Sequence, residues 1–253
     1  MAAAAIVPPQ DPQQPTPLSE PQRLLDTFIA PSKTFTDLRR SAMWWAPFLL
    51  IAIGSFWFIY VVDQKVGFEK VVDYAIQSQP KQAERLEGLP ADQREKAIRQ
   101  QVSITRYISY SVPAIALIIY AVFAGVLFAS FKFGANADIK FKTLFALIVY
   151  TRLPELLRAV LASASILAGV SADSFNIENP IATNPGYFID LSGSHVLRAL
   201  LTPLDVITIW TLVLVAIGVT CISNVKRGTA FAVVFGWFVL VTLIRVGFAA
   251  ATS

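Results

Sequence analysis

The chain has 253 residues, of which 55% are hydrophobic and only 15% are charged, whereas soluble domains carry about 25% charged residues. The mean hydropathy of +0.57 and the grouping of apolar residues into long blocks indicate an integral membrane protein. The net charge of +4 is modest, and no basic stretch with interleaved aromatics predicts nucleic-acid binding. A single cysteine, Cys221, excludes an internal disulfide, and a single histidine, His195, excludes Cys/His metal spacing.

The first 22 residues hold six of the fifteen prolines, at positions 8, 9, 12, 15, 17 and 21. Together with Gln, Ala and Thr these prolines predict a disordered, extended tail over residues 1–22, because such a composition cannot bury a core. A Pro-rich ligand for a partner is the alternative, but no basic residue flanks a clean P-x-x-P unit.

Residues 23–43 form a short amphipathic segment. The pattern favours helices that lie in the headgroup plane with their apolar face toward the lipid. A juxtamembrane linker with an ordinary basic flank is the alternative. The residues that define the expected interfacial face are Leu24, Leu25, Phe28, Ile29, Phe35 and Leu38, closed by Arg39 and Arg40.

The remaining residues, 44–253, predict an all-α membrane domain of five spans. Each span has roughly the 20 residues that a hydrocarbon core of about 30 Å requires. The expected spans cover about residues 44–62, 107–131, 144–170, 203–222 and 229–249. Lys and Arg are concentrated before the first span and in the loops 132–142 and 223–228, which predicts a cytoplasmic N-terminus and an external C-terminus.

The segment 63–106 between the first two spans is rich in Lys, Glu, Gln, Arg and Ala and is punctuated by Gly88-Leu89-Pro90. This composition predicts a helical hairpin on the outer face, whose second arm runs into the second span. A charged hairpin of this kind is typical of a solvated surface, and recognition of a partner is the alternative.

No motif of a hydrolase, a zinc protease or a nucleotide-binding loop occurs, so we expect no catalytic residue and no cofactor. The third span nevertheless contains Arg152, Glu155 and Arg158 on one arc of a helix that Pro154 should kink. Inserting a charged side chain at the centre of a membrane-spanning helix costs about 2.5–3.5 kcal/mol of free energy. The three charges mark either a polar site inside the bundle, for an ion, a substrate or a lipid headgroup, or simple anchoring of Arg152 and Glu155 at the interface.

Asp205 and Arg245 are a second pair of charges within apolar segments. They lie at similar depth near the outer ends of the fourth and fifth spans, which a tight turn joins as antiparallel neighbours. We therefore expect a structural ion pair between Asp205 and Arg245.

The sequence PSKTF at residues 31–35, followed by LRR at 38–40 and WWAPFLL at 44–50, resembles the opening of bacterial members of the Ypt-interacting-protein (Yip) family. The resemblance extends over about residues 25–250, with Tyr150 and Pro154 in the third span. It implies a five-span bundle with a cytoplasmic N-terminus. Eukaryotic relatives bind Rab-type GTPases, but the DLYGP motif of their N-terminal region is absent here, so that activity is not carried over.

Two hypotheses for function follow. The first is a non-enzymatic scaffold of the bacterial cytoplasmic membrane that binds membrane lipids or a protein partner through residues 23–43, with a homo-oligomer as the alternative assembly. The second is a small-solute or ion carrier that uses the charges of the third span, although an odd number of spans without a visible inverted repeat is unlike common carrier folds.

Overall fold

The computed structural model describes residues 17–169, 171, 175–189 and 193–252, and these residues form helices and loops without a strand. Three helices are long and apolar enough to cross a membrane. The first is α3 (Trp45–Lys65) and the last is α12 (Arg227–Thr252). The second, Val112–Gly134, consists of α7 (Val112–Ala129) and a π-helical turn, η1 (Ser130–Gly134). A fourth candidate combines α10 (His195–Leu201) with α11 (Val206–Ile222), which are bent by 43°. The all-helical membrane fold is thereby confirmed.

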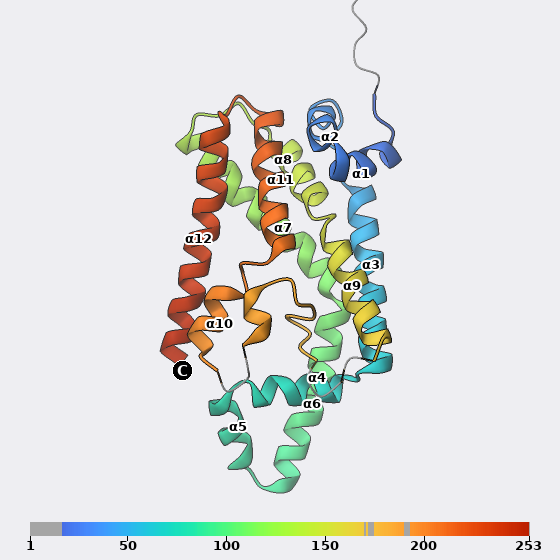
Figure 1. Ribbon diagram of the computed structural model, residues 1–253, viewed down its shortest axis with the longest axis vertical. Coiled ribbons are helices and arrows are strands. Elements are labelled where there is room, and N and C mark those ends of the chain that lie inside the picture. The colour runs from blue at the N-terminus through green and yellow to red at the C-terminus, as the bar shows by residue number, and fades with distance from the viewer. Residues whose placement is uncertain (1–16, 170, 172–174, 190–192, 253) are drawn as a thin grey trace, which may run out of the picture.

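The expected third span, 144–170, is not one continuous helix. It consists of α8 (Phe141–Thr151) and α9 (Glu155–Leu167), each of which is too short to cross a bilayer alone. Pro154 has no N–H to donate. Every other amide from Arg152 to Leu157 donates its hydrogen bond to the carbonyl three residues earlier. The two helices still follow one another along the long axis of the bundle (Figure 1).

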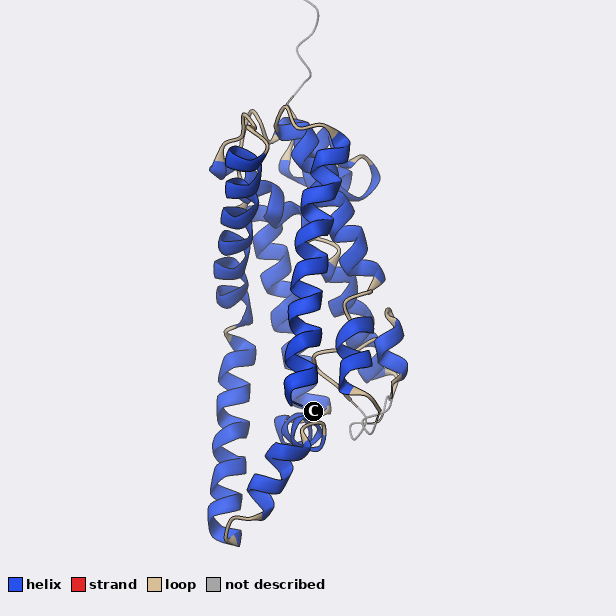
Figure 2. Ribbon diagram, turned by 90° about the vertical axis from the view of Figure 1, so that its left-hand side faces the viewer, coloured by secondary structure: helices blue, strands red, loops and turns tan. Residues whose placement is uncertain are grey.

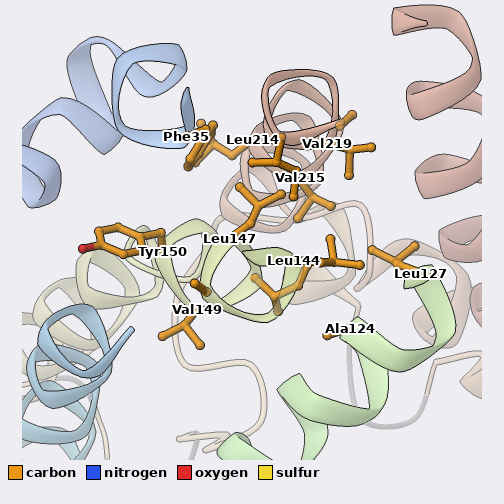
Figure 3. Packing of buried hydrophobic residues seen from close by; sticks show 14 of the residues in the cluster. Phe35, Ala124, Leu127, Leu144, Leu147, Val149, Tyr150, Leu214, Val215 and Val219 are labelled. Atoms are coloured by element: carbon orange, nitrogen blue, oxygen red, sulfur yellow. The ribbon is translucent and has the colours of Figure 1, made fainter. Parts of the chain in front are cut away.

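Helix α8 occupies the centre of the bundle. Its residues Ala146 to Thr151 are all fully buried, because α7, α11 and α3 surround it, while α2 (Pro31–Asp37) packs on α11. Figure 3 shows Leu144 and Leu147 between the side chains of α11 and α7. Gly218 permits the close approach of α11, since a Cβ atom there would lie 2.2 Å from Leu147 Cδ1. The apolar character of α8 on all sides therefore reflects burial in protein and not exposure to lipid.

The expected hairpin over residues 63–106 contains α4 (Phe68–Gln77), α5 (Pro80–Glu87) and α6 (Ala91–Tyr110). Helices α5 and α6 project beyond the end of the bundle at which the C-terminus lies (Figures 1 and 2). Only Ser111 separates α6 from α7, as the sequence predicted. Phe68, Val71 and Val72 of α4 pack against the end of α3 and hold this unit on the bundle.

The N-terminal segment is helical earlier than expected. Helix α1 (Glu20–Ile29) begins three residues inside the predicted disordered tail, because Ser19 and Gln22 form a capping box and Pro21 suits the first turn. The rest of the tail, 1–16, lies outside the described residues. Helix α2 follows after Ala30, and both helices lie at the end of the bundle opposite the C-terminus (Figure 1).

The eight residues expected at a lipid interface divide into two groups. Phe35 and Leu38 are fully buried in the main core, and Leu24 and Phe28 pack against it. Leu25 and Ile29, by contrast, are 66% and 80% exposed. Arg39 and Arg40 are also exposed. The sequence showed the amphipathic period but could not show that most of the apolar face meets α8 and α11 instead of lipid.

Candidate functional site

The break between α8 and α9 separates the charges of the expected polar site. Glu155 and Arg158 lie on the first turns of α9 and form an ion pair of 2.8 Å. Arg152 lies on the other side of the break and does not pair with Glu155 among the described ion pairs. The structure thus brings Glu155 and Arg158 together and assigns Arg152 to different surroundings.

Arg152 lies against two aromatic rings of α7. Its guanidinium carbon is 5.4 Å from the ring centroids of both Tyr120 and Phe123, a distance at which a cation is attracted to the negative face of the ring. Its Nε is buried and has no hydrogen-bond partner within the described chain. Arg152 therefore ties the break to α7, and the expected anchoring through Glu155 is replaced by cation–π contacts.

Asp205 is the most enclosed carboxylate among the described residues, with 2% of its side chain exposed. It caps the N-terminus of α11, where Oδ1 accepts a hydrogen bond of 2.9 Å from the amide of Thr208. Arg158 donates to the same oxygen at 2.7 Å, and the hydroxyl of Thr183 donates to Oδ2. Asp205, Arg158 and Glu155 thus join α9 to α11 in one charged network.

The predicted ion pair between Asp205 and Arg245 is not the pair that forms. Asp205 pairs with Arg158 because α9 lies closer to the start of α11 than the sequence order of the spans suggested. Arg245 lines the same pocket but makes no ion pair or hydrogen bond within the described part of the chain. Asp205 and Arg245 therefore line one pocket without pairing with each other.

A polar pocket lies beside this network. It has a volume of about 300 Å³ and is bounded by α9, α11, α12, the segment before α10 and the turn that joins α10 to α11. Asn179 and Asn184 form one wall, where their side-chain amides exchange hydrogen bonds of 2.7 and 3.3 Å. The other lining residues are Arg158, Glu178, Thr202, Pro203, Asp205, Thr208, Phe238, Val241, Thr242 and Arg245.

A second buried charge network holds the N-terminal helices on the bundle. Arg23 of α1 is the largest fully buried side chain in the described part of the chain, with 1% of it exposed. It donates through Nε to Asp37 Oδ2 at 2.6 Å and through Nη1 to Glu20 Oε1 at 2.9 Å. Tyr150 of α8 donates its hydroxyl hydrogen to Glu20 Oε2 at 2.9 Å. We call Glu20, Arg23, Asp37 and Tyr150 the N-terminal clasp.

Sequence reasoning missed the clasp. Arg23 looked like one of several basic residues flanking the first span, and Glu20 fell inside the expected disordered tail. The signal that could have revealed the helix was the pair Ser19 and Gln22, three residues apart ahead of an apolar run. Nothing in the local sequence indicates that Tyr150, 130 residues further along, meets Glu20.

The clasp lowers the pKa of the Asp37 carboxyl. Burial acts in the opposite direction, but it is outweighed by hydrogen bonds from Arg40 and Arg23 and by the charges of these two residues. A carboxylate with a lowered folded-state pKa stabilises the fold above its ordinary pKa, and this contribution is lost as the pH falls through the lower value.

A pH titration should reveal this contribution. We expect the difference in unfolding temperature between the wild type and Asp37→Asn to be full at neutral pH and to shrink below about pH 4, near the ordinary pKa of Asp. The measurement is thermal unfolding in detergent from pH 7 downward. For the exposed Glu84, the variant Glu84→Gln should show a small difference throughout. A difference for Asp37→Asn that stays constant down to the lowest pH would contradict the role of the clasp.

Within the described residues, no group of three His, Cys, Asp or Glu side chains is placed to hold a metal ion. His195 begins α10 behind its N-cap Ser194, and Cys221 is a free cysteine on α11.

Comparison with known proteins gives one match. The family model described as the Yip1 domain matches residues 25–248, which include the Arg158–Asp205 network and, of the clasp, Asp37 and Tyr150. No curated protein and no solved structure matches the chain.

Proposed function

Because the chain belongs to the Yip1 domain family, whose members are generally non-enzymatic membrane-trafficking proteins, we propose that it is a non-enzymatic membrane scaffold. It binds a protein partner through the outer surface of α1 and α2. The partner surface consists of Leu25 and Ile29, one helical turn apart, together with the neighbouring Asp26 and Lys33.

The N-terminal clasp is the observation that supports this proposal. A buried arginine with two carboxylates and a tyrosine fixes α1 and α2 in one orientation on α8. That orientation leaves Leu25 and Ile29 largely exposed while the rest of the apolar face is covered. Exposed apolar side chains with an acidic and a basic residue beside them are typical of a protein-binding surface.

The proposal places this surface in the bacterial cytoplasm. Arg39 and Arg40 lie between α2 and α3, Lys140 directly before α8, and Lys226 between α11 and α12. These short connections lie at the same end of the bundle as α1 and α2 (Figure 1). An excess of Lys and Arg in short loops favours the cytoplasmic side of a membrane. The opposite end, with α5, α6 and the C-terminus, would then face outward.

Extraction in lipid nanodiscs followed by mass spectrometry tests the proposal. We expect a protein to co-purify in stoichiometric amount with the wild type and to be lost from the double variant Leu25→Gln/Ile29→Gln. Both side chains are exposed, so the fold should persist. The control Leu89→Gln makes the same substitution at an exposed leucine between α5 and α6 and should retain the partner.

The other outcomes are equally informative. An identical set of proteins on the wild type and the double variant would overturn the proposed surface. Loss of bound lipid, without any protein, from the double variant would assign α1 and α2 to the membrane surface instead.

The carrier hypothesis keeps one specific observation in its favour, because two broken helices meet at the pocket. The α8–α9 break and the bend between α10 and α11 place Glu155, Arg158 and Asp205 side by side, as discontinuous helices do in many carriers. Solute uptake by reconstituted vesicles that disappears in Glu155→Gln, with the fold intact, would favour this second function.

A further inference from the structure

The pocket beside α9, α11 and α12 contains one basic side chain, Arg245, that pairs with no acidic residue in the described chain. Asp205 and Glu155 both pair with Arg158, so the guanidinium of Arg158 is already occupied by two carboxylates. Glu178, on the segment before α10, is exposed. Arg245 of α12 lines the pocket without any ion pair or hydrogen bond in the described chain. Its five N–H donors are therefore available to a ligand.

The position of Arg245 along α12 corresponds to a lipid headgroup. The helix begins at Arg227, and its axis advances about 27 Å between Arg227 and Arg245, at about 1.5 Å per residue. The hydrocarbon core of a bilayer is about 30 Å thick. If Arg227 lies at one membrane boundary, the guanidinium of Arg245 reaches the headgroup region of the opposite leaflet.

The lining of the pocket suits a molecule with an anionic head and an apolar tail. Phe238, Val241, Thr242 and Arg245 form one stripe of α12 along the pocket. Next to this stripe, Leu240 and Ile244 of α12 are 46% and 61% exposed. A lipid can therefore enter sideways, with its head beside Arg245 and Thr242 and its acyl chain along α12.

From these observations we infer that the pocket binds the phosphate group of an anionic phospholipid, with Arg245 as the principal ligand. Arginine forms paired, charge-assisted hydrogen bonds with phosphate oxygens, and the walls made of Asn179, Asn184 and Thr242 supply further polar contacts. A free phosphate-bearing molecule has the same head chemistry, but the apolar stripe of α12 favours the lipid. This site lies at the end of the bundle opposite α1 and α2 and does not depend on their proposed role.

Native mass spectrometry of the full chain tests this inference. The protein is purified in detergent, incubated with phosphatidylglycerol or with inorganic phosphate, and compared with the variants Arg245→Gln, Arg245→Lys and Arg227→Gln. We expect phosphatidylglycerol to bind the wild type and Arg227→Gln equally. Binding should weaken at least about tenfold in Arg245→Gln and less in Arg245→Lys, which keeps the charge but loses the paired geometry.

The two probes separate the possible sources of the phosphate. Inorganic phosphate that binds in an Arg245-dependent manner, with no retained lipid, would keep the phosphate site and overturn the lipid as its ligand. Equal phosphatidylglycerol binding by the wild type and Arg245→Gln would overturn the site altogether. Because Arg245 is exposed and makes no ion pair in the described chain, the unfolding temperature of Arg245→Gln should match that of the wild type and confirm that the variant is folded.

Discussion

Replacing Arg23 with methionine should destabilise the protein by about 3–5 kcal/mol, because it leaves buried carboxylates without their cation. Arg23 is 1% exposed, and its two partners Glu20 and Asp37 are 25% and 12% exposed. The loss should be local at first, since α1 and α2 detach from α8 while the remaining helices stay packed. Hydrogen exchange should therefore accelerate at α1 and α2 in Arg23→Met before global unfolding changes.

The matched control for this prediction is Arg40→Gln. Arg40 pairs with the same carboxylate, Asp37, but is 50% exposed, so its removal should cost less than about 1 kcal/mol. Equal effects of Arg23→Met and Arg40→Gln would show that burial of Arg23 contributes nothing. Partner binding should follow the same order, because the proposed surface exists only while α1 and α2 are held in place.

Replacing Asp205 with alanine should cost a comparable amount, about 3–5 kcal/mol, because it removes the carboxylate of a buried pair and the N-cap of α11 together. The double-mutant cycle with Arg158→Met should show a coupling energy of at least about 1 kcal/mol. The cycle of Asp205 with Arg245→Met should be additive within about 0.5 kcal/mol. Thermal or denaturant unfolding in detergent measures both cycles.

These two cycles decide which arginine is the partner of Asp205. Strong coupling to Arg245 and none to Arg158 would restore the pairing that the sequence predicted and contradict the geometry of α9. Arg245→Met by itself should change stability little, since its side chain is exposed and makes no ion pair in the described chain. A large loss in that variant would also weaken the inferred lipid site, whose test assumes a folded protein.

Much of the candidate site was visible in the sequence as a set of unusual residues. Charges within apolar segments are costly, so Arg152, Glu155, Arg158, Asp205 and Arg245 stood out without a structure. Their pairing did not follow from that signal. Arg152 meets aromatic rings and Arg158 meets Asp205, and these contacts depend on how α9 is displaced after the break.

The sequence by itself determined the class of the fold and the approximate position of most helices. The length of an apolar block is a local property of the sequence, so α3, α7, α11 and α12 overlap the residues expected for the first, second, fourth and fifth spans. The same local rules indicated that Pro154 would disturb the third span, although they did not show that it would divide the span into two helices.

Only the tertiary structure decided what each apolar or charged face meets. A helix that is apolar on all sides can be surrounded by lipid or by protein, so its sequence did not reveal the central position of α8. Likewise, the hydrophobic period of residues 23–43 could not distinguish a lipid surface from the α8–α11 core. Contacts such as that between Glu20 and Tyr150 join distant parts of the chain, and packing alone brings them together.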